Sequence, residues 1–211
     1  MGRRIFLLSP ASCSGKRASL LIREEAAFPL ALRVREPEGA ELGEVFSFVS
    51  GLYFRGKLAY ARAFGRSSGA VPPALVITPT RGMRAPESRV TAGDLREFAS
   101  VSIGADESRY RVPFESDARR LARTLDPGDD VVLLGSVATG KYVDILLGTL
   151  GPRLLFPSDF AGRGDMSRGG LLLRSAREGR ELAYTPASSG ERHGPRPPRL
   201  PAPAPREGDR P

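Results

Sequence analysis

The sequence predicts an α/β protein: a single three-layer domain on a mostly parallel sheet, with a C-terminal antiparallel hairpin at the sheet edge and a disordered tail. Two observations predict this class. Short apolar runs alternate along the chain with segments of helical periodicity, and several of these runs end in a turn that contains glycine and a cation. With 211 residues, 40% of them hydrophobic, the chain can bury one substantial core. We place the α/β domain at residues 1–186 and the tail at residues 187–211.

The N-terminal half supplies the first strands and helices. Residues 5–8 form an apolar run that is too short for a signal peptide, so they predict the first strand. Residues 28–35 alternate only partly and fit either a connecting excursion or an edge strand. Residues 41–49 and 50–64 have helical spacing, and residues 74–78 are a clear strand.

The second half continues the alternation. Thr91 and Asp94 have the spacing of a capping box, which predicts a helix start. Further along the chain we expect a loop at 102–113, a helix at 114–125, a strand at 131–134, a helix at 142–150 and a strand at 154–157. Four glycines in residues 158–170 predict an irregular loop. Residues 171–176 and 180–184, on either side of Arg-Glu-Gly, then predict the hairpin.

Residues 135–142 match the phosphate-loop pattern G-x-x-x-x-G-K, but Tyr142 stands where the pattern needs Ser or Thr to ligate magnesium. A standard ATPase or GTPase is therefore excluded. Backbone N–H groups at a helix N-terminus, beside Lys141, still favour an anion, with Ser136 and Gly140 as further candidates. The alternative is an ordinary strand-to-helix turn with a solvated lysine.

The loop at 158–170 brings two arginines and two aspartates together. Arg163 and Arg168 could hold an anion while Asp165 or Asp159 acts as a general acid or base. The alternative is a network of ion pairs that orders a surface loop.

Two earlier strands also end in a turn with a cation, Lys16 after the first strand and Arg81 after residues 74–78. The carboxyl ends of parallel strands are where open α/β sheets bind ligands. Near Lys16, Cys13 is a candidate nucleophile whose thiolate the neighbouring cations would stabilise. The alternative is a small residue that fills a tight loop.

The helix at 50–64 begins with aromatic and basic residues. Tyr53 and its neighbours could form a base-stacking platform, or they could anchor the helix in the core. In this helix we expect Leu58, Ala61 and Phe64 to face the core and Arg55, Lys57 and Arg62 to remain in water.

Composition excludes several classes of site. The chain has one cysteine, and its one histidine, His193, lies in the proline-rich tail. A disulfide, a cysteine-cluster zinc site and a histidine-based triad are thus excluded, and we predict neither a metal nor a cofactor. The net charge of +8 suits a polyanionic partner. No apolar run has the length of a membrane span, so we predict a cytoplasmic protein without a membrane partner.

The phrases SGLYFRGKLAYA, LLGSVATGKY, LLFP and GRGDMSRGGLLLR resemble those of an uncharacterised family of small bacterial proteins, over most of residues 3–185. More distantly, the order of strand, Gly-Lys loop, aromatic-basic helix and strand-end loop is similar to small α/β domains linked to modified-nucleobase metabolism, including those in archaeosine synthases. Neither resemblance supplies a catalytic residue. The chain has no Asn, and its single His lies in the tail, which argues against a mechanism like that of uracil-DNA glycosylases.

Two hypotheses follow for function. In the first, the protein binds a phosphate-bearing small molecule or nucleic acid at the carboxyl ends of its strands, and a carboxylate provides acid–base catalysis. In the second, it is a noncatalytic basic module that binds nucleic acid or protein. The first requires Lys141 and Asp165 to open onto the same cleft.

Overall fold

The computed structural model describes residues 2–67, 71–104, 106–137, 140–189, 194–195 and 197–198. Its strands are β1 (Arg4–Leu8), β2 (Ala40–Glu41), β3 (Ala74–Ile77), β4 (Met83–Arg84), β5 (Arg89–Val90), β6 (Asp130–Leu134), β7 (Leu154–Pro157) and β8 (Tyr184–Pro186). Its helices are α1 (Lys16–Ile22), α2 (Pro29–Arg35), α3 (Leu42–Ser50), α4 (Leu52–Phe64), α5 (Ala92–Ala99), α6 (Ser108–Thr124), α7 (Gly140–Leu150) and α8 (Asp165–Glu178), with short 3-10 turns at Gly151–Arg153 and Ser158–Phe160.

The main sheet has the order β4-β3-β1-β6-β7-β8. The four inner strands are parallel, and antiparallel partners flank them, β4 against β3 and β8 against β7. Residues 5–8 and 131–134 are fully buried because helices cover both faces of these strands. The prediction of a mostly parallel sheet with an antiparallel C-terminal edge is confirmed.

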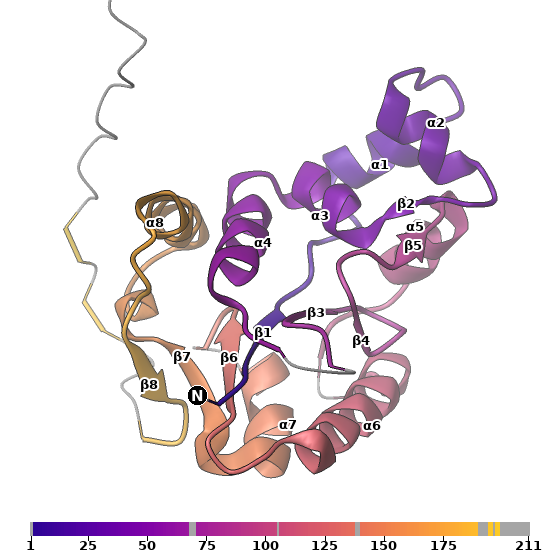
Figure 1. Ribbon diagram of the computed structural model, residues 1–211. Coiled ribbons are helices and arrows are strands. Elements are labelled where there is room, and N and C mark those ends of the chain that lie inside the picture. The colour runs from indigo at the N-terminus through magenta and orange to yellow at the C-terminus, as the bar shows by residue number, and fades with distance from the viewer. Residues whose placement is uncertain are drawn as a thin grey trace, which may run out of the picture.

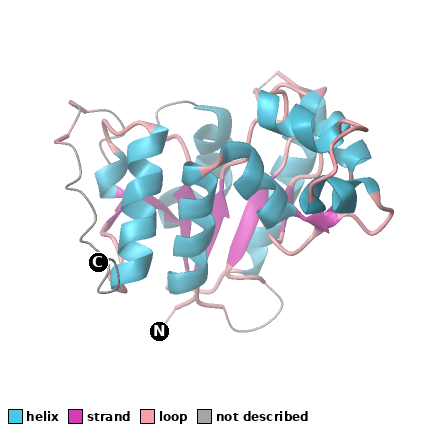
Figure 2. Cartoon of the chain, turned by 90° about the horizontal axis from the view of Figure 1, so that it is seen from above, coloured by secondary structure: helices cyan, strands magenta, loops and turns pink. Residues whose placement is uncertain are grey.

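Helices α4 and α8 lie on one face of the sheet, and α6 and α7 lie on the other (Figure 1). Figure 2 shows α4 and α8 side by side in front of the strands. A separate cluster of α1, α2, α3 and α5, with the two-stranded β2–β5 ribbon, sits at one end of the sheet, and β1 leads toward it from the N-terminus (Figure 1). This cluster forms one side of the candidate site.

The chain order changes direction at the centre of the sheet. β1 pairs with β3 on one side and with β6 on the other, so the connections that leave these strands run in opposite directions. Such a topological switch point opens a crevice outside the carboxyl ends of the two central strands. Here these strands are β1 and β6.

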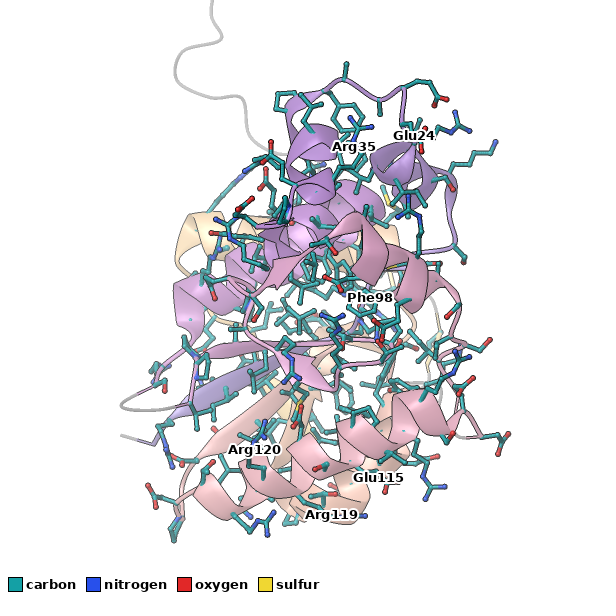
Figure 3. The ribbon with its side chains drawn as sticks, turned by 90° about the vertical axis from the view of Figure 1, so that its right-hand side faces the viewer. Glu24, Arg35, Phe98, Glu115, Arg119 and Arg120 are labelled. Atoms are coloured by element: carbon teal, nitrogen blue, oxygen red, sulfur yellow. The ribbon has the colours of Figure 1, made fainter. Side chains whose placement is uncertain are left out.

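Helix α6 carries charge on its outer surface and aromatic rings on its inner one. Arg119 donates to Glu115, and both lie along the outer side of the helix in Figure 3. Tyr110 and Phe114 are fully buried and stack at 5.5 Å. Their burial explains why the helix begins at Ser108, although we expected a loop up to Pro113.

The predicted hairpin strands were placed wrongly. Residues 171–176 belong to helix α8, and the antiparallel edge consists of β7 and β8 instead. The run Leu171–Leu172–Leu173 fits a buried strand or one turn of a buried helix equally well, so periodicity alone does not separate the two. Residues 28–35, which fitted an edge strand or an excursion, lie mostly in helix α2.

The prediction that glycines exclude a helix before residue 171 was also wrong, because α8 begins at Asp165 and contains Gly169. A Cβ on Gly169 would lie 2.8 Å from the Cα of Tyr53, and a Cβ on Gly56 would lie 2.6 Å from the carbonyl oxygen of Gly169. The two glycines therefore allow α4 and α8 to cross with their backbones in contact.

The predicted tail falls mostly outside the described residues. Ala187, its first residue, is buried and donates its backbone N–H to the carbonyl of Leu154. Ala187 therefore packs against β7, directly after the predicted boundary at 186.

Candidate functional site

A cavity of about 650 Å³ lies at the topological switch point. We call it the switch-point cavity. Its wall is formed by residues 9–14 after β1, Pro79 after β3, Ser136, Lys141 and Tyr142 after β6, Asp165 at the start of α8, Ser50 at the end of α3, Tyr53 in α4, and residues 98, 99 and 101–103 at and after the end of α5.

Lys141 and Asp165 thus open onto the same cavity. Lys141 is exposed at the first turn of α7, where the free N–H groups of the helix add positive potential. The side chain of Asp165 is 68% exposed at the first residue of α8, and Arg168 lies 3.7 Å from it. The cavity therefore holds a cation and a carboxylate that both remain accessible to a ligand.

Two tyrosines bring phenol groups to the same wall. Burial raises the pKa of Tyr142 to about 12 and also raises the pKa of Tyr53, so both stay protonated at neutral pH. The hydroxyl of Tyr53 is buried and makes no hydrogen bond of good geometry in the described part of the chain, although the nearby Arg168 guanidinium acts on it and opposes the rise in its pKa. A buried unpaired hydroxyl is unfavourable, so a ligand atom that reached it would be stabilised.

The predicted arginines have other partners. Arg81 pairs with Asp94 and Glu97 of α5. Arg168 is buried, donates twice to the carbonyl of Phe160 at 3.0 and 3.3 Å, and lies over the Phe160 ring. Both contribute to packing, and neither is part of the described cavity wall.

The remaining predicted residues also lie away from the described wall. Lys16 is exposed at the start of α1, and Asp159 is exposed in the 3-10 turn after β7. Arg163 donates to Ser167 at 3.3 Å. Gly140 begins α7, with the side chain of Asp144 next to it. Of the predicted set, the described wall includes Tyr53, Ser136, Lys141 and Asp165.

Cys13 lines the cavity, but it does not have the environment of a nucleophile. Burial raises the pKa of its thiol to about 12, opposite to the expected effect of the Lys16-Arg17 pair. The expectation overlooked that the cysteine side chain turns inward while Lys16 and Arg17 point to water. The alternative of a small residue filling a tight loop fits this burial.

Lys57 was expected in water, but it is buried, with 1% of its surface exposed. Its Nζ donates to the carbonyl oxygen of Ser9 at 2.5 Å and approaches Ser9 Oγ at 3.0 Å. The rings of Tyr53 and Phe54 lie 4.5 and 4.8 Å from the same nitrogen. The sequence does hold a signal for this burial, because Tyr53, Lys57 and Tyr60 share one helical face.

Comparisons of the chain with protein-family models, with curated proteins and with solved structures give no match. The resemblance to a bacterial family and to archaeosine-synthase domains therefore stays a prediction. No helix in the described ranges is both long and apolar enough to cross a membrane, and those ranges hold no cluster of metal-ligating side chains.

Proposed function

We propose that the protein binds a phosphate-bearing small molecule, such as a nucleotide, in the switch-point cavity, with Asp165 as the general acid or base. The observation that carries this proposal is the common opening of Lys141 and Asp165 at the carboxyl ends of β6 and β7. Ligands of open α/β sheets bind at this position. The volume of about 650 Å³ also suits a small ligand, since such pockets measure roughly 300–1,000 Å³.

The cavity offers different chemistry on its two sides. Lys141 and the start of α7 favour the phosphate. Phe98, Val101 and Ile103 lie on the side of α5 and offer an apolar surface to the planar part of a nucleotide. Tyr53 adds a hydroxyl that lacks a partner in the described chain. A ligand with a phosphate at one end and a ring at the other fits this division.

A small molecule is favoured over nucleic acid because much of the basic charge is used internally. On α6, Arg111 and Arg119 pair with Glu115, and Arg120 pairs with Asp117. On the outer face of this helix, visible in Figure 3, ion pairs thus partly neutralise three of its five arginines, which weakens the attraction of the helix for a phosphate backbone.

Isothermal titration calorimetry with adenosine and guanosine 5′-phosphates, inorganic phosphate and a short oligonucleotide tests this proposal. We expect Lys141→Ala to weaken nucleotide binding at least about tenfold, which corresponds to about 1.4 kcal/mol. Lys16→Ala is the matched control, because Lys16 follows the other Gly-Lys turn and is exposed outside the described wall. If both variants lose the same nucleotide affinity, the binding is explained by nonspecific charge attraction. If only the oligonucleotide binds, the basic-module hypothesis is favoured.

A second variant tests the apolar side without removing charge. Tyr53→Phe deletes only the unpaired hydroxyl. We expect nucleotide affinity to fall about two- to tenfold, as for the loss of one hydrogen bond, with no loss of thermal stability. Unchanged affinity would show that the ligand does not reach this hydroxyl.

A further inference from the structure

Ser9 is the first residue after β1, where the strand reaches the switch-point cavity. Its side chain lines the cavity although the residue is only 5% exposed. Space for this side chain comes from Gly135, since a Cβ there would lie 2.8 Å from the Ser9 Cβ and 3.1 Å from its Oγ. The ends of the two central strands thus hold the Ser9 hydroxyl in a tight, defined place.

The partner of this hydroxyl is Lys57, whose Nζ lies 3.0 Å from Ser9 Oγ. Aromatic rings of α4 flank the ammonium group, and no carboxylate of the described chain lies within ion-pair distance of it. Burial lowers the pKa of Lys57 to about 7, although Asp165 of α8 acts in the opposite direction. A substantial share of Lys57 is therefore an uncharged amine at neutral pH, able to accept a proton.

We propose that Ser9 and Lys57 form a nucleophile–base pair that hydrolyses an ester or thioester bound in the switch-point cavity. This inference deepens the proposed function, since it uses the same cavity and assigns a reaction to it. The base of this reaction is Lys57, and Asp165 acts only through its charge, which favours the protonated amine. Pairs of serine with lysine are a known variant of the nucleophile–base arrangement. Cys13, the other candidate nucleophile in the wall, has a raised pKa, and within the described residues its thiol donates to the backbone carbonyl of Ala11 rather than to a base.

The reaction proceeds in two steps that share one base. Lys57 Nζ accepts the hydroxyl proton as Ser9 Oγ bonds to the carbonyl carbon, and the C=O electron pair moves onto its oxygen. When the C=O bond re-forms, the bond to the leaving group breaks, and the leaving alcohol or thiol takes the proton from Lys57. Water then attacks the carbonyl carbon of the acyl-serine and gives a proton to Lys57. The bond between this carbon and Ser9 Oγ breaks, and Lys57 returns the proton to Ser9 Oγ. The net change is ester plus water to acid plus alcohol, or thioester plus water to acid plus thiol.

The alternative role for Lys57 is to hold the end of β1 through the Ser9 carbonyl. That role needs the backbone oxygen of Ser9 and not its hydroxyl. Ser9→Ala therefore separates the two roles, because it keeps the contact to the carbonyl while it removes the nucleophile.

A phosphonofluoridate probe, which reacts with activated serines and releases fluoride, tests the pair by intact-mass and peptide mass spectrometry. We expect one adduct, on Ser9, with a labelling rate that rises with pH through neutrality and then levels off. Ser9→Ala should abolish the adduct, and Lys57→Met should slow labelling at least about 100-fold, the usual contribution of a general base. Lys16→Met, the matched change at an exposed lysine, should leave the rate unchanged.

Several outcomes would overturn the pair. These are no adduct on folded wild-type protein at pH 8.5, adducts spread over other serines of the cavity such as Ser102, or a rate at Ser9 that does not vary with pH. If Lys57→Met does not fold, the wild-type pH profile and Ser9→Ala decide alone. If wild-type protein binds nucleotide but forms no Ser9 adduct, the nucleophile–base pair is refuted and the phosphate site is not. If Ser9 is labelled but no nucleotide binds, the phosphate site is refuted and the pair is not.

Discussion

Two stretches of the chain combine glycines with cations, residues 135–142 and residues 162–170, and the structure uses them differently. In the first, Gly135 leaves space for Ser9, and Lys141 reaches the switch-point cavity. In the second, Gly169 allows α8 to contact the backbone of α4, and Arg168 is buried against Phe160. Similar composition therefore forms part of a cavity wall in one place and a helix contact in the other.

The largest effect should come from Gly169→Ala. The new Cβ would lie 2.8 Å from a backbone atom of Tyr53, which no side-chain rotation relieves. We expect a loss of about 2–3 kcal/mol in the free energy of unfolding, measured by urea denaturation. Gly148→Ala is the control, because that glycine lies within α7 with open space around it, and it should be neutral or stabilising by up to about 1 kcal/mol. Equal effects in both variants would contradict the backbone contact.

Arg168→Met should come next. The variant keeps much of the apolar stem but removes both donors to the carbonyl of Phe160, so we expect a loss of about 2 kcal/mol in the same measurement. Arg177→Met, at the exposed end of α8, should change stability by less than about 0.5 kcal/mol. A stable Arg168→Met protein would restore the ligand-binding interpretation of this arginine.

Lys57 connects the two stretches, since α4 contacts α8 and Lys57 contacts Ser9 beside Gly135. Its pKa is lowered by burial from 10.5 to about 7, so between these values the unfolded chain binds the extra proton and the native state does not. Stability should therefore rise with pH above about 7, by up to about 1.4 kcal/mol per pH unit. Below about 7 Lys57 is protonated in both states, so stability no longer changes with pH through Lys57 and the cost of the buried charge is fully present.

The measurement is the difference in free energy of unfolding between wild-type protein and Lys57→Met, from pH 6 to 8.5. The range ends at pH 8.5 because above pH 9 the raised pKa of Cys13 lowers the stability of both proteins, as its thiol ionises first in the unfolded chain. A difference that stays constant across this range would mean that Lys57 does not titrate there.

The smallest effect on stability should come from Lys141→Ala. Its side chain is exposed, and no hydrogen bond or ion pair of that side chain is present in the described structure. We expect the free energy of unfolding to change by less than about 0.5 kcal/mol, while nucleotide binding weakens. A large loss of stability would mean that Lys141, like Arg168, is a packing residue. The two glycine-containing stretches would then not differ in the way described.

The sequence predicts the sheet well because its central strands are continuous apolar runs. Strands β1, β6 and β7 begin within one residue of their predicted limits and end where expected. The common opening of Lys141 and Asp165 also follows from local information, since both come after parallel strands whose carboxyl ends share an edge.

The failures concern contacts between segments far apart in the chain. Gly169 belongs to a helix because Gly56 and Tyr53 lie against it, and no local pattern contains that fact. Lys57 was assigned to water from its charge, whereas its burial depends on Ser9 at the end of a different element. The buried residues of the site were therefore harder to predict than the exposed ones.

Both margins of the main sheet end in very short strands, β4 with two residues and β8 with three. Each offers little free backbone for another polypeptide to add to, and β8 ends in Pro186, which has no N–H to donate. Within the described residues, each margin thus offers only two or three residues of backbone to which a second copy could add a strand.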